Sequence, residues 1–183
     1  MDKFYKRALL ILCLFFLHTG MAQTPGSISA NRVKFVDSLQ VGIFHARFTA
    51  DFSDSDKEIL EVALTVLDTL IYSNLFIKAV KDYKFKSKKR KGRTNYVGTT
   101  VKSRRKWTND EIYAMIISGD DALGGDGVID LYLKIGSGFD PNARTGNGII
   151  EFRDTYFRES DEFCVAATLL HEYMHVIGFK HFA

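Results

Sequence analysis

The stretch from Ser53 to Val80, "SDSDKEILEVALTVLDTLIYSNLFIKAV", most constrains the fold. Ser55 and Glu58 match the spacing of a capping box, so they predict the start of a helix. Apolar residues then recur at helical spacing: Ile59, Val62, Val66, Leu67, Leu70 and Ile71. A long helix with one apolar face must bury that face against another layer. We therefore predict a backing helix that covers a sheet.

Three segments supply the strands that this helix would cover. Residues 41–52, 128–135 and 149–157 are rich in β-branched and aromatic residues between turn-forming segments, which favours strands. Thr108 and Glu111 form a second capping box that opens a short helix, and an apolar helical pattern covers residues 161–177. The order of elements predicts an α+β fold with a mixed, twisted sheet.

The first residues have the pattern of a targeting signal. Lys3, Lys6 and Arg7 precede an apolar run over residues 8–17, and small residues follow near residue 22. The run is shorter than the about 20 apolar residues of a membrane span, so we expect no stable membrane insertion after cleavage. The sequence predicts a signal peptide over 1–22, an N-terminal arm or short pro-segment over 23–40, and one domain over 41–183, in a secreted or periplasmic protein.

Charge and cysteine content indicate which disulfides and which partners this chain can have. Cleavage after residue 22 would leave 22 basic and 21 acidic residues, and Cys164 would remain without a cysteine to pair with, so we expect it to be a small buried core residue. Twelve basic residues lie between Lys81 and Lys106. No nucleic-acid-binding motif accompanies this basic block and the chain carries an export signal, so we expect a solvated loop or attraction to an anionic surface, and no nucleic-acid partner.

The window "HEYMHVIGFKH", residues 171–181, contains three histidines and a glutamate, residue types that bind metal ions and transfer protons. His171 and His175 are four residues apart on the predicted helix, so both imidazoles project from one face and can reach one ion. Gly178 can take a positive φ, end the helix and return His181 as a third ligand. His45 lies alone in a predicted strand, where a structural or surface role is the usual one.

Glu172 lies at the flank of the histidine face. From there it can hydrogen-bond a metal-bound water instead of coordinating the metal. Zinc held by neutral imidazoles, with one coordination position open, lowers the pKa of a bound water to about 7. Glu172 could then take the proton of that water as a general base, which predicts a hydrolytic site.

These eleven residues resemble the His-Glu-x-x-His-x-x-Gly-x-x-His signature of the metzincin clan of zinc metalloendopeptidases. The resemblance implies a zincin-like N-terminal subdomain, in which a twisted sheet is backed by a long helix and an active-site helix. It also implies zinc on His171, His175 and His181, with Glu172 as the catalytic base. Residues 148–152, "GIIEF", would be the edge strand that binds an extended peptide substrate.

The sequence departs from the signature's usual surroundings after His181. Metzincins continue into a C-terminal subdomain with a methionine-containing turn, whereas only Phe182 and Ala183 follow here. We therefore expect a domain truncated after the zinc motif, which binds zinc and hydrolyses casein-like substrates weakly or not at all. We expect a monomeric, exported endopeptidase acting on peptide or protein substrates; the alternative is a non-catalytic zinc- or peptide-binding relic of a truncated metalloprotease.

Overall fold

The computed structural model describes residues 33–82, 93–94, 100–101, 106–120, 125–140 and 142–179. The predicted signal peptide, the arm up to residue 32, most of the basic block and His181 lie outside these residues. The elements, in chain order, are β1 (Phe35–Val41), β2 (Phe44–Thr49), α2 (Asp54–Ile71), α3 (Asn74–Asp82), β3 (Arg93–Thr94), β4 (Thr100–Val101), α4 (Asn109–Ser118), β5 (Ile129–Gly136), β6 (Ala143–Gly146), β7 (Ile149–Arg153), α5 (Asp154–Glu159) and α6 (Glu162–Val176).

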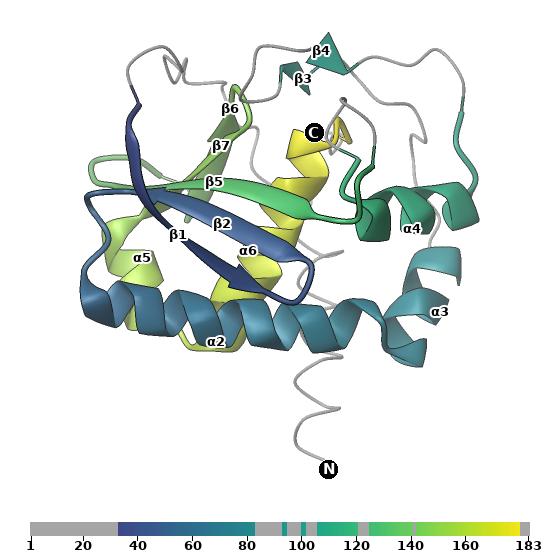
Figure 1. The fold of residues 1–183 in the computed structure, drawn as a ribbon, viewed down its shortest axis with the longest axis horizontal. Helices are drawn as coiled ribbons and strands as arrows, with labels where there is room; N and C mark the ends of the chain where they lie inside the picture. Colours follow the sequence, from purple (N-terminus) through teal and green to yellow (C-terminus); the bar gives the residue numbers. More distant parts are fainter. Residues whose placement is uncertain are drawn as a thin grey trace.

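A mixed sheet forms the centre of the described chain, in the order β1-β2-β5-β7-β6. β2, β5 and β7 run parallel, while β1 and β6 pair antiparallel at the two edges. Figure 1 shows α2 lying along one side of the strands and α6 passing behind the sheet. The predicted α+β class, with a mixed sheet and both kinds of element, is confirmed.

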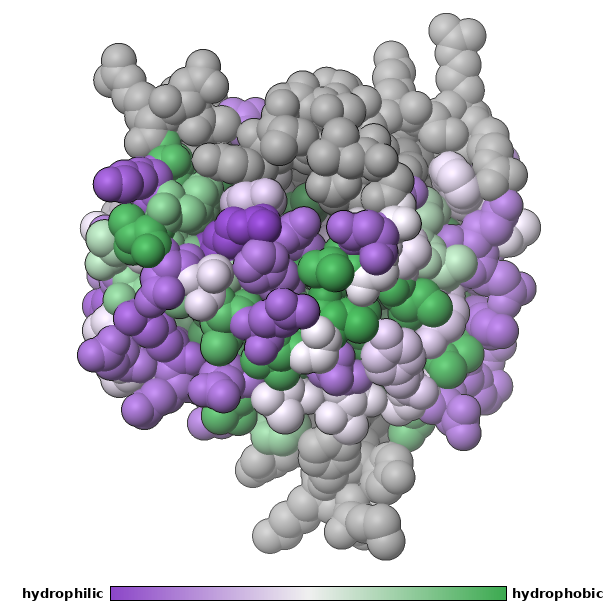
Figure 2. Space-filling view, in the orientation of Figure 1, coloured by the Kyte–Doolittle hydropathy of each residue, from purple (hydrophilic) through white to green (hydrophobic). Residues whose placement is uncertain are grey.

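The two faces of the sheet differ in chemistry. Phe44, Ala46 and Phe48 alternate with His45 and Arg47 along β2, and only the first three join the buried core. The apolar face packs against the helices, with Leu64 and Leu67 of α2 in the same core cluster. On the side of the molecule shown in Figure 2, hydrophilic residues are interspersed with smaller hydrophobic areas.

The N-terminal boundary of the predicted domain was wrong. Residues 35–40 were assigned to the arm, but they form most of β1, which pairs with β2 from Phe35 opposite Thr49 to Val41 opposite Phe44. The segment predicted as one strand, 41–52, therefore divides into the end of β1, a two-residue turn, and β2.

The predicted edge strand was also wrong. Residues 149–153 form β7, which lies between β5 and β6, so the edge strand is β6. A two-residue turn, Asn147–Gly148, joins β6 to β7, and both residues have positive φ, 51° and 75°. Asn-Gly is the preferred sequence for such a hairpin turn because both residues tolerate this conformation. The predicted strand also ended too late, since α5 begins at Asp154.

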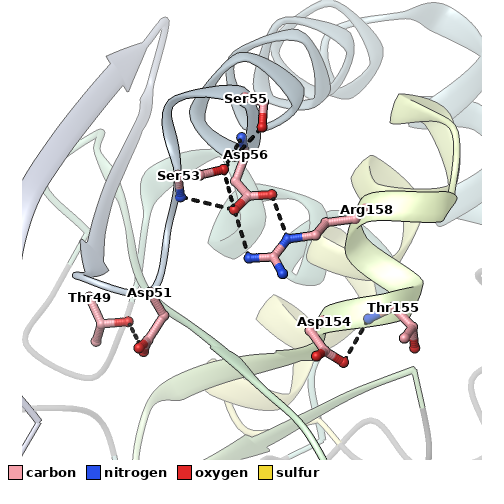
Figure 3. Close-up of polar contacts among 8 residues, drawn as sticks. All are labelled: Thr49, Asp51, Ser53, Ser55, Asp56, Asp154, Thr155 and Arg158. Atoms are coloured by element: carbon pink, nitrogen blue, oxygen red, sulfur yellow. Dashed lines mark hydrogen bonds and ion pairs between the residues drawn. The ribbon is translucent and has the colours of Figure 1, made fainter.

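Helix α2 begins two residues before the predicted start. Ser53 is the N-cap, and Asp56, instead of Glu58, completes the capping box with it. The Asp56 carboxylate also accepts hydrogen bonds from Arg158 of α5, whose Nε and one terminal nitrogen each lie 3.0 Å from a carboxylate oxygen (Figure 3). These bonds favour Asp56 over Glu58 as the partner of the N-cap. The second predicted capping box, Thr108 with Glu111 on α4, is confirmed.

The buried face of α2 agrees in part with the predicted one, since Leu67, Leu70 and Ile71 are buried as expected. Val62 was expected in the core but is 48% exposed, whereas Leu60, Ala63 and Leu64 are fully buried. The predicted long helix also ends at Ile71, and α3 follows at an angle of 69°. Among the described residues no single helix is long and apolar enough to span a membrane; by length and composition alone, the bent pair of α2 and α3 could.

Replacement of Asp56 by asparagine is expected to destabilise the fold by about 1–3 kcal/mol. Asp56 is 1% exposed, and its carboxylate accepts hydrogen bonds from Ser53 Oγ, at 2.7 Å, and from Arg158. The change therefore removes a charged acceptor from a buried capping box. Chemical denaturation measures this loss. Asp54→Asn is the control, because its side chain is 96% exposed and should change stability by less than about 0.5 kcal/mol. Equal losses in the two variants would contradict the account.

A comparison of the wild type with Asp56→Asn at different pH values tests the charge of this carboxylate. Burial alone would raise the pKa of Asp56, but hydrogen bonds from Arg158 and Ser53 outweigh it and hold the pKa below its ordinary value. The stabilisation is therefore complete above the unfolded-state pKa of about 3.9 and is lost as the pH falls through the folded-state pKa. The stability difference between wild type and Asp56→Asn should shrink below about pH 4. A difference that stays constant down to acid unfolding would contradict this assignment.

Candidate metal centre

Helix α6 carries the candidate site and is fixed at its start by Asp161. The Asp161 side chain accepts a hydrogen bond from the backbone N–H of Cys164 at 2.8 Å, which satisfies one of the free donors at a helix start. Val165, Leu169 and Leu170 are buried in the core beneath the sheet. The helix matches the predicted range to within a residue at each end, so it places its last turn as the sequence predicted.

His171 and His175 lie one turn apart within the last two turns of α6, and their rings meet edge to face. Their ring centroids are 5.0 Å apart and the rings are nearly perpendicular, at 87°. Ligand atoms of His171, Glu172 and His175 all lie within 4.8 Å of one another. These three residues could hold a metal ion. The motif spacing predicted this for the two histidines, whereas Glu172 was expected at their flank and not as a ligand.

The His175 ring is oriented by the chain that follows the helix. Its Nδ1 lies 2.7 Å from the backbone oxygen of Phe179, and a carbonyl can only accept, so Nδ1 carries the proton. In the neutral imidazole, Nε2 is then the unprotonated nitrogen, which is the one able to act as a ligand. A hydrogen bond of this kind is the usual support of a histidine ligand, because it fixes both tautomer and ring orientation.

The turn after α6 makes this contact possible. Gly178 has φ of 98°, and its N–H donates to the oxygen of His175 at 3.1 Å, while the N–H of Phe179 donates to Met174 at 2.9 Å. This pair of bonds is a Schellman motif, which reverses the chain at a helix end. The reversal directs the carbonyl of Phe179 back to the ring of His175.

Gly178→Ala is expected to cost about 1–2 kcal/mol of stability, because a Cβ is disfavoured at positive φ. It should also weaken metal binding, since the turn sets the position of Phe179 and thus the ring of His175. Titration with zinc and chemical denaturation measure the two effects. Gly138→Ala is the control: Gly138 also has positive φ, 75°, but lies in the loop after β5, so it should lower stability alone. Unchanged zinc affinity in Gly178→Ala would refute the role of the turn.

Glu172 lies on the side of α6 that packs against β6. It is 2% exposed, and its carboxylate oxygen Oε2 accepts a hydrogen bond from the hydroxyl of Thr145. The same hydroxyl lies 3.3 Å from the backbone oxygen of Glu172. Sequence reasoning missed both Thr145 and the carbonyl of Phe179, because neither residue type signals a site on its own.

The other residues considered from sequence lie apart from this group. His45 is on the sheet face opposite the helices, where its Nδ1 lies 3.2 Å from Asp130, as expected for a structural or surface histidine. Cys164 was expected to be buried but is only half-buried. Burial and the neighbouring Asp161 raise the pKa of its thiol, which keeps it protonated and unreactive at neutral pH. His181 lies outside the described residues.

Comparison with known proteins gives no match to this chain among protein-family models, curated proteins or solved structures.

Proposed function

We propose that this chain is an exported, zinc-dependent endopeptidase whose metal is held by His171, His175 and His181. The observation that carries the proposal is the grouping of His171, Glu172 and His175, whose ligand atoms lie within 4.8 Å of one another in the last two turns of a buried helix. Imidazole nitrogens are preferred zinc ligands, and His175 has the outer hydrogen bond that supports one. When bound, zinc would supply a water of lowered pKa and polarise the scissile carbonyl.

Glu172 is the general base in this proposal. It follows His171 directly and projects toward β6, where its carboxylate accepts a hydrogen bond from the hydroxyl of Thr145, which fixes its orientation. After taking the proton from the attacking water, Glu172 returns it to the leaving amine. A site that only stored metal would have no need of a buried carboxylate beside its ligands.

The substrate in this proposal is an extended peptide that lies along β6. This strand is the edge of the sheet and contacts α6, so a peptide added to the sheet there would pass beside the histidines. Main-chain hydrogen bonds to an edge strand bind a peptide with little dependence on its side chains. β6 replaces residues 148–152 in this role, because the latter lie mostly in the interior strand β7.

The proposal is tested with the full chain, fluorogenic peptides of mixed sequence, and an assay able to detect slow cleavage. We expect hydrolysis that a zinc chelator abolishes and added zinc restores. Stoichiometric zinc without hydrolysis would support the zinc-binding relic instead. Hydrolysis that survives complete removal of metal would refute the metal-dependent mechanism.

A further inference from the structure

A threonine hydroxyl joins the edge strand β6 to the proposed catalytic base. Thr145 of β6 is 5% exposed, and its Oγ1 donates to Oε2 of Glu172 on α6. The two residues are 27 positions apart in the chain. The contact therefore exists only because β6 packs beside the last turns of α6.

The strand alternation directs Thr145 toward the helix. Thr145 lies opposite Ile150 of β7, whose side chain is fully buried in the core, and cross-strand partners share a face of the sheet. The preceding residue, Arg144, lies opposite Glu151 on the other face. The register of the β6–β7 hairpin thus decides which residue of β6 meets Glu172.

Charged residues on the outer face hold β6 in this register. Arg144 lies with Nε 2.8 Å from Glu151, and its guanidinium stacks over the ring of Phe139 at 4.3 Å. Lys134 of β5 approaches the other oxygen of the same carboxylate at 2.9 Å. Glu151 is 3% exposed, and a buried carboxylate with two cationic partners makes strong, directional hydrogen bonds. The strand segment that carries Thr145 is therefore clamped on its outer side.

We infer that Thr145 is a positioning residue, which fixes the Glu172 carboxylate for proton transfer and connects it to the strand along which the peptide binds. The inference rests on the proposed function. A base must lie within hydrogen-bond reach of the proton it abstracts, and a small misplacement of a catalytic group costs much of the rate. Because the proposed peptide lies along the strand that carries Thr145, movement of β6 during binding is transmitted to the base through this contact.

The test compares Thr145→Val, which removes the hydroxyl at nearly constant shape, with Thr145→Ser, which keeps it. With zinc bound, Thr145→Val should lower kcat by about 10–100-fold. KM and zinc stoichiometry should not change, because neither the peptide backbone contacts nor the metal ligands are altered. Thr145→Ser should recover most of kcat, which a purely packing role of the threonine would not predict.

A second measurement needs no activity. In metal-free protein, melting temperatures are compared for Thr145→Val, Glu172→Ala, which removes the acceptor of the hydroxyl, and the double variant. Residues in direct contact couple, so the double variant should depart from the sum of the single shifts by about 2–5 °C. Glu162 lies at the start of the same helix. The shifts in melting temperature caused by Thr145→Val and Glu162→Gln should therefore be additive in the double variant.

The outcomes separate this inference from the proposed function. Additive melting temperatures for Thr145 and Glu172 would overturn the inference whatever the activity. Unchanged kcat in Thr145→Val, in an enzyme that hydrolyses peptides, would overturn it while the proposed function stands. Absence of hydrolysis in the wild type, with coupled melting temperatures, would refute the proposed function and reduce the contact to a structural one, which also overturns the positioning role.

Discussion

Glu172→Gln is expected to leave zinc bound at the wild-type stoichiometry and to lower peptide hydrolysis by about 10²–10⁴-fold. Glutamine has nearly the same shape and can still accept the hydroxyl of Thr145 through its amide oxygen, so the fold should persist. It cannot take a proton at neutral pH, so the base is lost. Steady-state kinetics and metal analysis of the same sample measure both quantities.

The control for this variant is Glu162→Gln, in the first turn of the same helix and away from the histidines. It should hydrolyse peptides at the wild-type rate. Glu172 is one of the three grouped residues that could hold a metal ion. Loss of zinc from Glu172→Gln would therefore mean that its carboxylate is a metal ligand, and the assignment as the base would be wrong.

His175→Ala is expected to remove zinc almost completely at concentrations that saturate the wild type, and to abolish hydrolysis with it. The ring supplies one of the two imidazoles that the structure brings together, and its orientation is fixed by Phe179. Without it, the proposed site keeps only His171 and His181, and two protein ligands are too few for a stable zinc site of the catalytic type. Zinc titration against a chromogenic chelator measures the loss.

His45→Ala is the matched control. His45 lies on the opposite face of the sheet beside Asp130, so its removal should leave zinc binding intact. If His175→Ala bound zinc as tightly as this control, the metal would lie elsewhere in the chain, and the assignment of the site would be refuted.

The candidate site was predictable from sequence because its parts are local. Two histidines at a spacing of four residues on one helix, and a glycine three residues later, depend only on helix geometry and on the φ that glycine permits. The structure accordingly places His171, Glu172 and His175 together. Thr145 was not predictable, because its contact with Glu172 depends on packing between β6 and α6.

The errors in the predicted fold have two kinds of cause: a long-range contact, and signals that the prediction did not use. Ser53 with Asp56 and Ser55 with Glu58 both fit a capping box, and the choice between them is decided by Arg158, 102 residues from Asp56. The Asn147–Gly148 pair is a strong hairpin signal that would have identified β6 as a strand. The nearly continuous burial of β7 is typical of an interior strand, and this too argued against its placement at the edge.

The central claim is that histidines of α6 hold a zinc ion, and X-ray absorption at the zinc edge of the purified full chain tests it most directly. We predict about one zinc per chain, with nitrogen and oxygen neighbours at about 2.0–2.2 Å and the multiple-scattering pattern of imidazole, all lost in His175→Ala. A folded chain without zinc, or a zinc with a sulfur neighbour at about 2.3 Å, which would implicate a cysteine in place of the histidines, would contradict the account.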